Sequence, residues 1–357
     1  MSLSLGIVGL PNVGKSTLFQ AITKKQVPKE NYPFCTIDPN IGTVAVPDER
    51  IDALANITHS QRKIYPTVKF ADIAGLVKGA NKGEGLGNKF LAEIRNVDAI
   101  LYVLRCFKNK NITNTQTTIN VLQEKNILET EMMLKDLETL EKRLAKLKKE
   151  KRVKSSEKKL LKELETLTKA IKFLNAGQNL INQKWNQEEK EILENYNLLT
   201  IKKRLFLFNG LIDEISPETI KTFQENNWPF LVINALDELS SNDLTPQERI
   251  SLGLPAETEL NTVIKKSYQL LNLITFFTTG ADETKGWNLP KNSSAPQAGG
   301  AIHSDFEKRF IRAEVIFWEN LIKSGSISRA REKGLIRTEG KEYKVKDGDV
   351  IEIKSDA

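Results

Sequence analysis

The feature that most constrains the fold is a glycine-rich stretch near the amino terminus. Residues 9–16 read GLPNVGKS and fit the pattern G-x-x-x-x-G-K-[ST]. A short apolar run precedes the stretch, and a helical pattern of Leu18, Phe19, Ala21 and Ile22 follows it. A strand, this loop and a helix in that order predict a phosphate-binding loop, or P-loop. The alternative is a plain glycine turn between a strand and a helix, which the context disfavours.

Each part of a P-loop has its own chemical task. Gly9 and Gly14 let the backbone bend so that successive N–H groups face the phosphates. Lys15 is expected to reach the β- and γ-phosphates, and Ser16 is expected to ligate Mg²⁺. The nucleotide-binding residues predicted in this loop are Asn12, Val13, Gly14, Lys15, Ser16 and Thr17.

A second nucleotide motif follows further along the chain. The strand pattern of residues 67–71 runs directly into the sequence DIAG at 72–75. The Asp72 carboxylate is expected to hold Mg²⁺ through a water molecule, and the Gly75 N–H is expected to contact the γ-phosphate. Thr36 lies between the two motifs, where a switch threonine completes the Mg²⁺ shell while the γ-phosphate is present. D-x-x-G alone is a weak signal, but paired with the P-loop it is strong.

Strand patterns on both sides of a helical segment predict an α/β domain. Residues 99–104 form a continuous apolar run, as expected of a strand buried on both faces of a parallel sheet. Strand signals return at 203–208 and 229–234, and a helical pattern over 260–272 follows. We therefore expect the helical segment between these strands to be inserted in a nucleotide-binding domain.

The inserted segment has the leucine spacing of two paired helices. Apolar residues recur at intervals of three and four in two sets, which residues 153–156 separate. This spacing predicts an antiparallel helical hairpin with an apolar seam, ending at 175–177. The first set is Leu137, Leu140, Leu144 and Leu147, and the second is Leu160, Leu164, Leu167, Ile171 and Leu174.

Most of the net charge of +7 lies in this hairpin. Residues 135–165 hold 12 Lys and Arg against 7 Asp and Glu. The simplest interpretation is a solvated helical face. The sharper alternative is a patch that faces RNA.

Residues 273–357 have the pattern of a small α+β unit. An apolar run at 274–278 predicts a strand, and a helix is expected near 305–324. Short terminal strands are expected around a D-G turn at 347–348. We therefore expect mixed strands with one helix. His303 is interpreted as a helix cap rather than a catalytic group.

Composition excludes several classes of protein. Two cysteines, Cys35 and Cys106, argue against a disulfide scaffold and fit a reducing cytosol, although Cys35 beside Thr36 leaves a redox role open. With only His59 and His303, a multi-histidine metal site is excluded. No apolar run approaches the roughly 20 residues that span a bilayer, and no signal peptide is visible. We therefore expect a cytoplasmic protein without membrane contact.

Together these motifs resemble the YchF/Obg-like ATPase family, a TRAFAC-class branch of the P-loop NTPases. The resemblance covers nearly the whole chain, and its motifs are long and specific. It implies a Ras-like α/β domain (1–124 and 200–272), an inserted α-helical coiled-coil hairpin (125–199) and a C-terminal α+β domain of β-grasp type, the TGS domain (273–357). The matching motifs lie at residues 6–17, 32–37, 72–80, 82–88, 301–308, 310–314 and 345–350.

The same resemblance implies ATP hydrolysis with Mg²⁺ and association with the ribosome. The contact is expected with rRNA or ribosomal proteins of the large subunit, the small subunit or both, and no DNA partner is expected. The favoured hypothesis is a nucleotide switch, in which the γ-phosphate orders the loops around Thr36 and residues 75–87 and hydrolysis releases them. Two alternatives stay open: a nucleotide-dependent RNA- or ribosome-binding module with vestigial hydrolysis, and a GTP-preferring GTPase.

The predicted base-reading loop argues for ATP. GTPases read guanine with N-K-x-D after a sheet strand, where the Asp accepts hydrogen bonds from the base. Here a predicted strand leads into Asn209 and Gly210, which we expect beside the nucleotide, and Ile212 occupies the acceptor position. Many YchF relatives have N-x-x-E at this place, so the chain also departs from its own family. A loop shift could bring Asp213 or Glu214 back into register.

Activation of the attacking water is the least regular part of the motif set. Ras-like enzymes place a glutamine directly after D-x-x-G, and here that place holds Leu76. Some NTPases of the wider class use K⁺ held partly by a P-loop asparagine, which Asn12 matches. Several relatives carry a histidine near position 114. This chain has Asn114 there instead, so a histidine-assisted mechanism finds no support. We expect slow hydrolysis that K⁺ or a partner raises, with Lys15, Gly75 and Asn12 as the catalytic candidates.

Overall fold

The computed structural model describes residues 3–24, 40–73, 93–108, 120–153 and 158–356. The chain divides into two compact units, and each is described by itself. The P-loop unit comprises Ser4–Ala21 and Phe70–Leu252, and the C-terminal unit comprises Met1–Leu3, Ile22–Lys69 and Gly253–Ala357. The three-domain boundaries derived from the sequence remain a prediction.

The P-loop unit is built on a sheet with the strand order β4-β1-β5-β6-β7. The β1–β5, β5–β6 and β6–β7 pairs are all parallel, so the carboxyl ends of these strands meet at one edge. Ligands of open α/β sheets bind at that edge. The strands are β1 (Ser4–Val8), β4 (Thr67–Asp72), β5 (Ala99–Arg105), β6 (Lys203–Asn209) and β7 (Phe230–Ile233), and β4 begins in the C-terminal unit.

Burial explains why these segments form the centre of the sheet. All seven residues of β5 are buried, and only the first residue of β6 is exposed, which confirms the predicted two-sided strand. The rings of Tyr102 and Phe206 stack across these two strands with centroids 5.0 Å apart. Outside the hairpin, the described part of the unit contains the helices and 3₁₀ turns α1 (Lys15–Thr23), η2 (Leu180–Asn182), α6 (Gln187–Glu194), η3 (Ile212–Glu214), α7 (Pro217–Glu225), α8 (Ala235–Ser240) and α9 (Pro246–Ser251).

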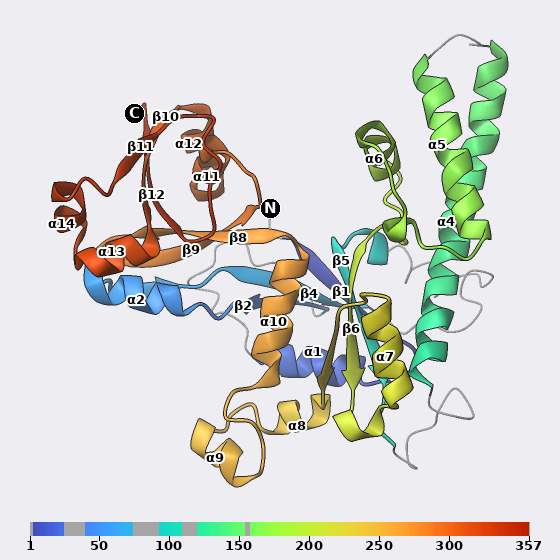
Figure 1. Ribbon diagram of the computed structural model, residues 1–357, viewed down its shortest axis with the longest axis horizontal. Coiled ribbons are helices and arrows are strands. Elements are labelled where there is room, and N and C mark those ends of the chain that lie inside the picture. Colours follow the sequence, from blue (N-terminus) through green and yellow to red (C-terminus); the bar gives the residue numbers. More distant parts are fainter. Residues whose placement is uncertain (1–2, 25–39, 74–92, 109–119, 154–157, 357) are drawn as a thin grey trace. The chain divides into compact units, whose positions relative to one another are not determined.

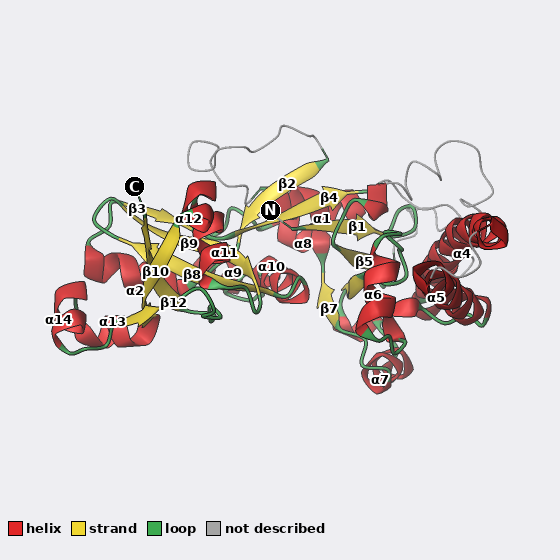
Figure 2. Cartoon of the chain, turned by 90° about the horizontal axis from the view of Figure 1, so that it is seen from above, coloured by secondary structure: helices red, strands yellow, loops and turns green. Residues whose placement is uncertain are grey.

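Helices α4 (Val121–Val153) and α5 (Lys158–Asn175) form the predicted hairpin. They lie side by side (Figure 1), and Figure 2 shows the same pair from above. The helix α4 begins well before the first predicted seam leucine. Its Asp136 is buried and accepts hydrogen bonds from the backbone N–H groups of Leu199 (3.0 Å) and Thr200 (2.8 Å). The seam prediction is confirmed, with Leu140, Leu147, Leu160, Leu167 and Leu174 buried in one cluster.

The C-terminal unit contains a mixed sheet with the order β11-β10-β12-β8-β9-β3. Its two faces carry separate cores. Helix α11 packs on one face with Phe276 and Val315, and α2, α13 and α14 pack on the other with Phe277 and Ile316. Its strands are β3 (Arg62–Ile64), β8 (Leu273–Thr279), β9 (Glu283–Pro290), β10 (Phe310–Phe317), β11 (Arg337–Glu339) and β12 (Asp349–Ser355). Its helices are α2 (Glu49–Thr58), α10 (Glu259–Leu270), α11 (Ala295–Ile302), α12 (Ser304–Lys308), α13 (Trp318–Ser324) and α14 (Ile327–Glu332).

Part of this unit comes from an early segment of the chain. Strand β3 pairs in parallel with β9, from Arg62 opposite Glu283 to Ile64 opposite Lys285. Strand β2 (Ile41–Ala45) is the neighbour of β4 in the strand order, and Val46 N–H donates to the Pro66 carbonyl at 2.8 Å. Residues 62–64, which lie between the two predicted nucleotide motifs, therefore form a strand of the C-terminal unit.

The prediction of one helix near residues 305–324 is wrong. Residues 310–317 form β10, which pairs antiparallel with both β11 and β12. The buried residues Ala313 and Val315 point to one face of the sheet, as the period of two in a strand requires. The expectation of a single helix in residues 273–357 is also wrong, because α11, α12, α13 and α14 all lie within that range. His303 caps α12 as predicted, since its Nδ1 accepts from Asp305 N–H at 3.3 Å.

Among the residues that the structure describes, no helix combines the length and apolar character needed to cross a membrane.

Candidate nucleotide-binding site

The P-loop follows β1 directly and ends in α1. Gly14 has a φ of +94°, and a Cβ there would lie 2.2 Å from Asn209 Nδ2. A Cβ on Gly9 would lie 2.5 Å from the Val103 carbonyl oxygen. Both positions therefore require glycine, one for its backbone conformation and one for close approach. Asn12 also adopts a positive φ, of 64°, which asparagine tolerates better than most residues.

Lys15 lies folded over this loop. Its side chain is 8% exposed, and its Nζ donates to the Leu10 carbonyl at 2.9 Å. Burial lowers the pKa of Lys15, and the nearby charge of Asp72 acts in the opposite direction. A buried ammonium with few partners gains most from an added anion. Lys15 begins α1, so it also stands where the helix dipole favours phosphate.

Ser16 and Asp72 meet beside Lys15. The Ser16 hydroxyl donates to Asp72 Oδ2 at 3.1 Å. Burial raises the pKa of Asp72, while the Ser16 hydrogen bond and the Lys15 charge oppose that rise. A hydroxyl and a carboxylate are hard oxygen donors, which Mg²⁺ prefers and binds together with phosphate oxygens. The donor set therefore fits Mg²⁺.

Asn209 joins the P-loop to two other loops. Its side chain is nearly completely buried, and its Nδ2 donates to the Val13 carbonyl at 2.8 Å. Its Oδ1 accepts from Ala235 N–H at 3.0 Å, and the next residue, Gly210, donates its N–H to the Ile233 carbonyl at 3.0 Å. The predicted base-reading loop therefore lies against the P-loop at the carboxyl ends of β6 and β7.

Glu214 follows Asn209 in the predicted base-reading loop, and backbone N–H groups orient its carboxylate. Its Oε2 accepts from Leu211 N–H at 2.9 Å, and its Oε1 accepts from Lys108 N–H at 3.2 Å. Both carboxylate oxygens are thus engaged by the backbone. Ile212 opens the short turn η3, with 58% of its surface exposed.

Two exposed apolar residues that the sequence analysis did not single out flank this loop. Leu211 is 50% exposed and Leu236 is 65% exposed, next to Asn209 and its partner Ala235. Exposed leucines that flank a nucleotide loop offer apolar contact to a base. Nothing in their spacing along the chain distinguishes them from ordinary surface residues.

Several predicted site residues lie outside the described residues. These are Thr36, Gly75, Leu76 and Asn114, together with the switch loop of residues 75–87. The predicted residues that the structure does bring together at one sheet edge are Asn12, Val13, Gly14, Lys15, Ser16, Thr17, Asp72, Asn209 and Gly210.

Two family models match the chain. Residues 4–135 match the model described as "50S ribosome-binding GTPase". Residues 273–356 match a model named for the C-terminal domain of YchF GTPases, which is described as a protein of unknown function. The two matches cover the P-loop and the C-terminal strands.

Relatives match the chain over nearly its whole length. The chain is 41% identical over 366 residues to the ribosome-binding ATPase YchF of Bacillus subtilis, with 99% of each chain covered. It is 43% identical over 365 residues to the protein of that name from Mycoplasma genitalium, again with 99% of each covered. The solved structure of the Schizosaccharomyces pombe YchF GTPase superposes with a TM-score of 0.88 at 34% identity, covering 99% of this chain and 98% of that one.

Proposed function

Because the chain belongs to the YchF family of P-loop NTPases, we propose that it is a ribosome-binding ATPase that works as a nucleotide switch. The observation that carries the proposal is the meeting of Lys15, Ser16 and Asp72 at one sheet edge. These residues supply a cation for phosphate and two oxygen ligands for a metal. Curated relatives are named ribosome-binding ATPases, which supports both the reaction and the partner.

The proposed reaction is hydrolysis of ATP to ADP and phosphate. Lys15 leaves the Leu10 carbonyl to bind the β- and γ-phosphates, while the N–H groups at the start of α1 face the same oxygens. Ser16 and Thr36 would ligate Mg²⁺, and Asp72 would hold it through water. Such a metal would supply positive charge to neutralise the phosphate oxygens. The Gly75 N–H contacts the γ-phosphate, so its loss on hydrolysis releases the switch loops.

The proposed base is adenine. A guanine site needs an acceptor for the guanine N–H groups, and an unmatched polar group there is costly. The Ile212 side chain cannot accept a hydrogen bond, and backbone hydrogen bonds from Leu211 and Lys108 hold the Glu214 carboxylate in place. Leu211 and Leu236 are the apolar side chains available to cover the ring.

The proposed water activation relies on a cation rather than on a side chain. Leu76 cannot orient water, and Asn12 is the P-loop residue that would help to hold K⁺. Basal turnover is therefore slow, and K⁺ or the ribosome raises it. The proposed catalytic group comprises Lys15, Gly75 and Asn12.

We propose that the hairpin (125–199) and the TGS domain (273–357) carry the ribosome contact. The excess of Lys and Arg over residues 135–165 suits rRNA. In this proposal, the nucleotide state of the P-loop NTPase domain (1–124 and 200–272) controls how the hairpin and the TGS domain contact the ribosome. Because ribosomes work in the cytoplasm, the cytoplasm is the compartment that we propose for this chain.

Phosphate release with and without ribosomes tests this function. We expect slow release from ATP that ribosomes accelerate at least about tenfold, well below the roughly 10³- to 10⁵-fold that an arginine finger supplies to a GTPase. Lys15→Met should abolish release under both conditions. Release from GTP that equals release from ATP would indicate a GTPase. Ribosome binding that depends on nucleotide without any ribosome-stimulated release would indicate the binding module with vestigial hydrolysis.

A further inference from the structure

The strands β8 and β12 of the C-terminal unit are joined at one end only. Their ladder contains a single position, Val350 opposite Phe277. Just before it, Gly348 N–H donates to the Thr275 carbonyl at 2.9 Å, and Thr275 N–H donates to Asp347 Oδ1 at 2.8 Å. On its other side β12 stays paired with β10 to its end. In the described structure, β12 therefore has an open edge toward β8 beyond Val350.

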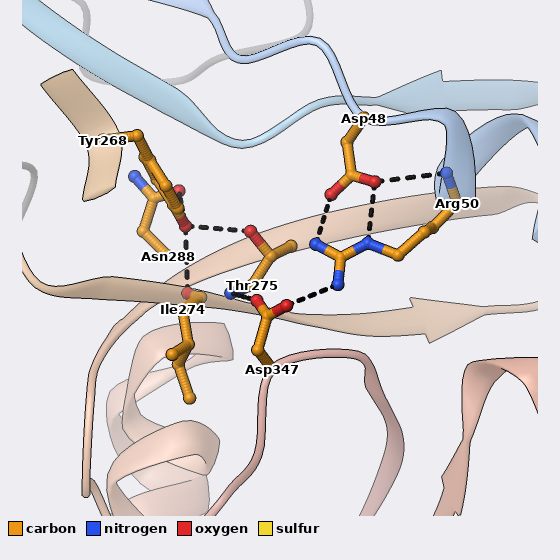
Figure 3. A network of polar contacts seen from close by, with 7 residues as sticks. All are labelled: Asp48, Arg50, Tyr268, Ile274, Thr275, Asn288 and Asp347. Carbon is orange, nitrogen blue, oxygen red and sulfur yellow. Dashed lines mark hydrogen bonds and ion pairs between the residues drawn. The ribbon is translucent and has the colours of Figure 1, made fainter. Parts of the chain in front are cut away.

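Polar contacts fix the joined end of the two strands (Figure 3). The Asp347 carboxylate accepts from Thr275 N–H at 2.8 Å on one oxygen and from Arg50 Nη1 at 2.6 Å on the other. Asp48 holds the same guanidinium, through Nε at 2.8 Å and Nη2 at 2.7 Å. Charge-assisted hydrogen bonds of this kind are strong. The opening beyond the joined end is therefore a preformed feature of this unit.

A cavity of about 330 Å³ lies where the two strands separate. Its lining includes Thr278 and Thr279 of β8 and the successive residues 350–353 of β12. Successive residues of a strand point to opposite faces of a sheet. A cavity that all of them line must lie along the edges of the strands and not over one face. The backbone edge of β12 therefore borders this cavity.

This edge offers backbone hydrogen-bonding groups to another strand. In an antiparallel pair such as β10 and β12, every second residue directs its N–H and C=O away from the partner strand. Since the ladder to β8 does not continue past Val350 in the described chain, these groups of residues 351–355 face the opening. An edge of this kind is a template for the addition of a further strand.

Apolar side chains line the cavity on both faces of the sheet. Trp287, Ile302 and Ile353 pack against the core on the face that carries α11. Ile316 and Leu321 belong to the core on the face that carries α13. The successive side chains of an added strand alternate between the two faces. The cavity therefore suits an extended segment with two consecutive apolar residues, one for each face.

The charges around the cavity favour a basic segment. Its lining holds three glutamates and one arginine. Two of these glutamates, Glu314 and Glu352, are directly opposite each other in the β10–β12 ladder, where like charges repel. Arg331 donates to Glu314 at 2.7 Å, whereas Glu352 pairs with Lys354 and keeps 59% of its side chain exposed. A Lys or Arg from a bound segment would offset this excess of negative charge.

We propose that this cavity binds an extended segment of a partner protein, which adds as a strand to the edge of β12. The segment contains two consecutive apolar residues flanked by Lys or Arg. Its backbone pairs with residues 351–355, and its apolar side chains enter the cavity on the two faces of the sheet. Because every lining residue belongs to the C-terminal unit, this binding is independent of the proposed ATPase activity.

The test is the binding of a fluorescein-labelled peptide, Gly-Lys-Ile-Ile-Lys-Gly, to the full-length protein, measured by fluorescence anisotropy. The side chains of this peptide have the same order in both directions, so it suits a parallel or an antiparallel strand. We expect saturable binding with a dissociation constant below about 1 mM. Methylation of the backbone nitrogens of both isoleucines removes hydrogen-bond donors and should weaken binding at least about threefold. Replacement of both lysines by glutamate should weaken it to a similar extent.

Two variants of the protein locate the bound peptide. Glu352→Lys reverses a charge at the cavity and should weaken binding of the lysine peptide at least about threefold. Ile327→Ser removes an apolar side chain of the lining that is 38% exposed, and should weaken binding to a similar extent. The matched controls are Glu319→Lys and Ile311→Ser, which change residues that are 49% and 53% exposed and lie outside the lining. Both controls should bind the peptide as wild type does.

Three results would overturn the proposal. The first is the absence of saturable binding of the lysine peptide. The second is equal affinity for the N-methylated peptide, which would indicate a site for apolar side chains or a small apolar cation instead of a strand. The third is wild-type affinity in Glu352→Lys and Ile327→Ser, which would place the bound peptide elsewhere on the protein.

Discussion

The Ser16 hydroxyl donates a hydrogen bond to Asp72 Oδ2 at 3.1 Å, although the two residues come from motifs far apart in the sequence. Ser16 belongs to the first turn of α1, and Asp72 ends β4. Neither residue alone identifies a metal site, because serine and aspartate are common at helix starts and strand ends. Their meeting beside Lys15 is what makes this edge of the sheet a candidate nucleotide site.

Asp72→Asn should separate stability from metal binding. Burial raises the pKa of Asp72. The carboxyl therefore stabilises the fold fully below the unfolded-state pKa, and this contribution to stability is lost as pH rises through the folded-state pKa. At pH 7 the nucleotide-free variant should therefore be at least as stable as wild type, while Mg²⁺ no longer tightens ATP binding. Urea unfolding at pH 7 and ATP titrations with and without Mg²⁺ measure both effects. A less stable variant that still shows the full Mg²⁺ effect would contradict the assignment.

Asn209→Ala should damage both the fold and the site. It leaves the Val13 carbonyl and the Ala235 N–H buried without their partner, which should cost about 2–4 kcal/mol of unfolding free energy. ATP affinity should also fall, because the P-loop loses its support from β6. Asn226→Ala is the control, since Asn226 is exposed at the end of α7 and its side-chain Nδ2 donates to the nearby Thr222 carbonyl. It should change stability by less than about 0.5 kcal/mol. Equal losses of stability in the two variants would refute the role of Asn209 in joining Val13 and Ala235.

Glu124 should make stability fall with rising pH. Burial raises its pKa to about 7, against the hydrogen bond from Arg105 N–H. A raised carboxyl pKa stabilises the protein below the unfolded-state pKa, and this contribution is lost as pH rises through about 7. Between pH 5 and 8 wild type should therefore lose up to about 3 kcal/mol more than Glu124→Gln, which keeps an acceptor for Arg105.

Urea unfolding across this pH range measures the difference. Glu191→Gln is the control, since Glu191 is exposed on α6. That variant should follow the wild-type pH dependence. Parallel curves for wild type and Glu124→Gln would show that Glu124 does not titrate there.

Asn12→Gly should remove the response to K⁺ without destroying the loop. Asn12 has a φ of 64°, and glycine adopts that conformation without strain, so the test avoids the strain that alanine would add. ATP affinity should stay within about threefold of wild type, a shift below 1 kcal/mol. Single-turnover hydrolysis should become the same in K⁺ and Na⁺. A variant that keeps the wild-type K⁺ stimulation, or a wild-type protein without any, would end the cation hypothesis.

Elements with one dominant local signal could be predicted from the sequence. Strand β5 is a continuous apolar run, and the hairpin leucines repeat at helical spacing. In both cases the apolar pattern in the sequence predicted which residues are buried in the structure. Strand β10 could not be predicted, because the apolar residues of 305–324 suit a helix as well as a strand. Pairing with β11 and β12 decides between them, and such long-range pairing is not encoded in local spacing.

Some residues of the candidate site could be predicted from the sequence, and others could not. The P-loop and Asp72 could be found because the chemistry of phosphate and metal binding demands particular residues at particular spacings. The position of Glu214 could not, since it depends on two backbone N–H groups, one of them on Lys108 after β5. The hydrogen bond from Asn288 to the Thr67 carbonyl likewise joins residues that only the folded C-terminal unit brings together.

The most direct test of the central claim is competition of ATP and GTP for the site. A fluorescent ADP analogue bound to the full-length protein is displaced by each nucleotide in the presence of Mg²⁺. ATP should displace the analogue at a concentration at least about fivefold lower than GTP does, since a missing acceptor costs about 1–3 kcal/mol. Displacement by GTP at an equal or lower concentration would contradict it.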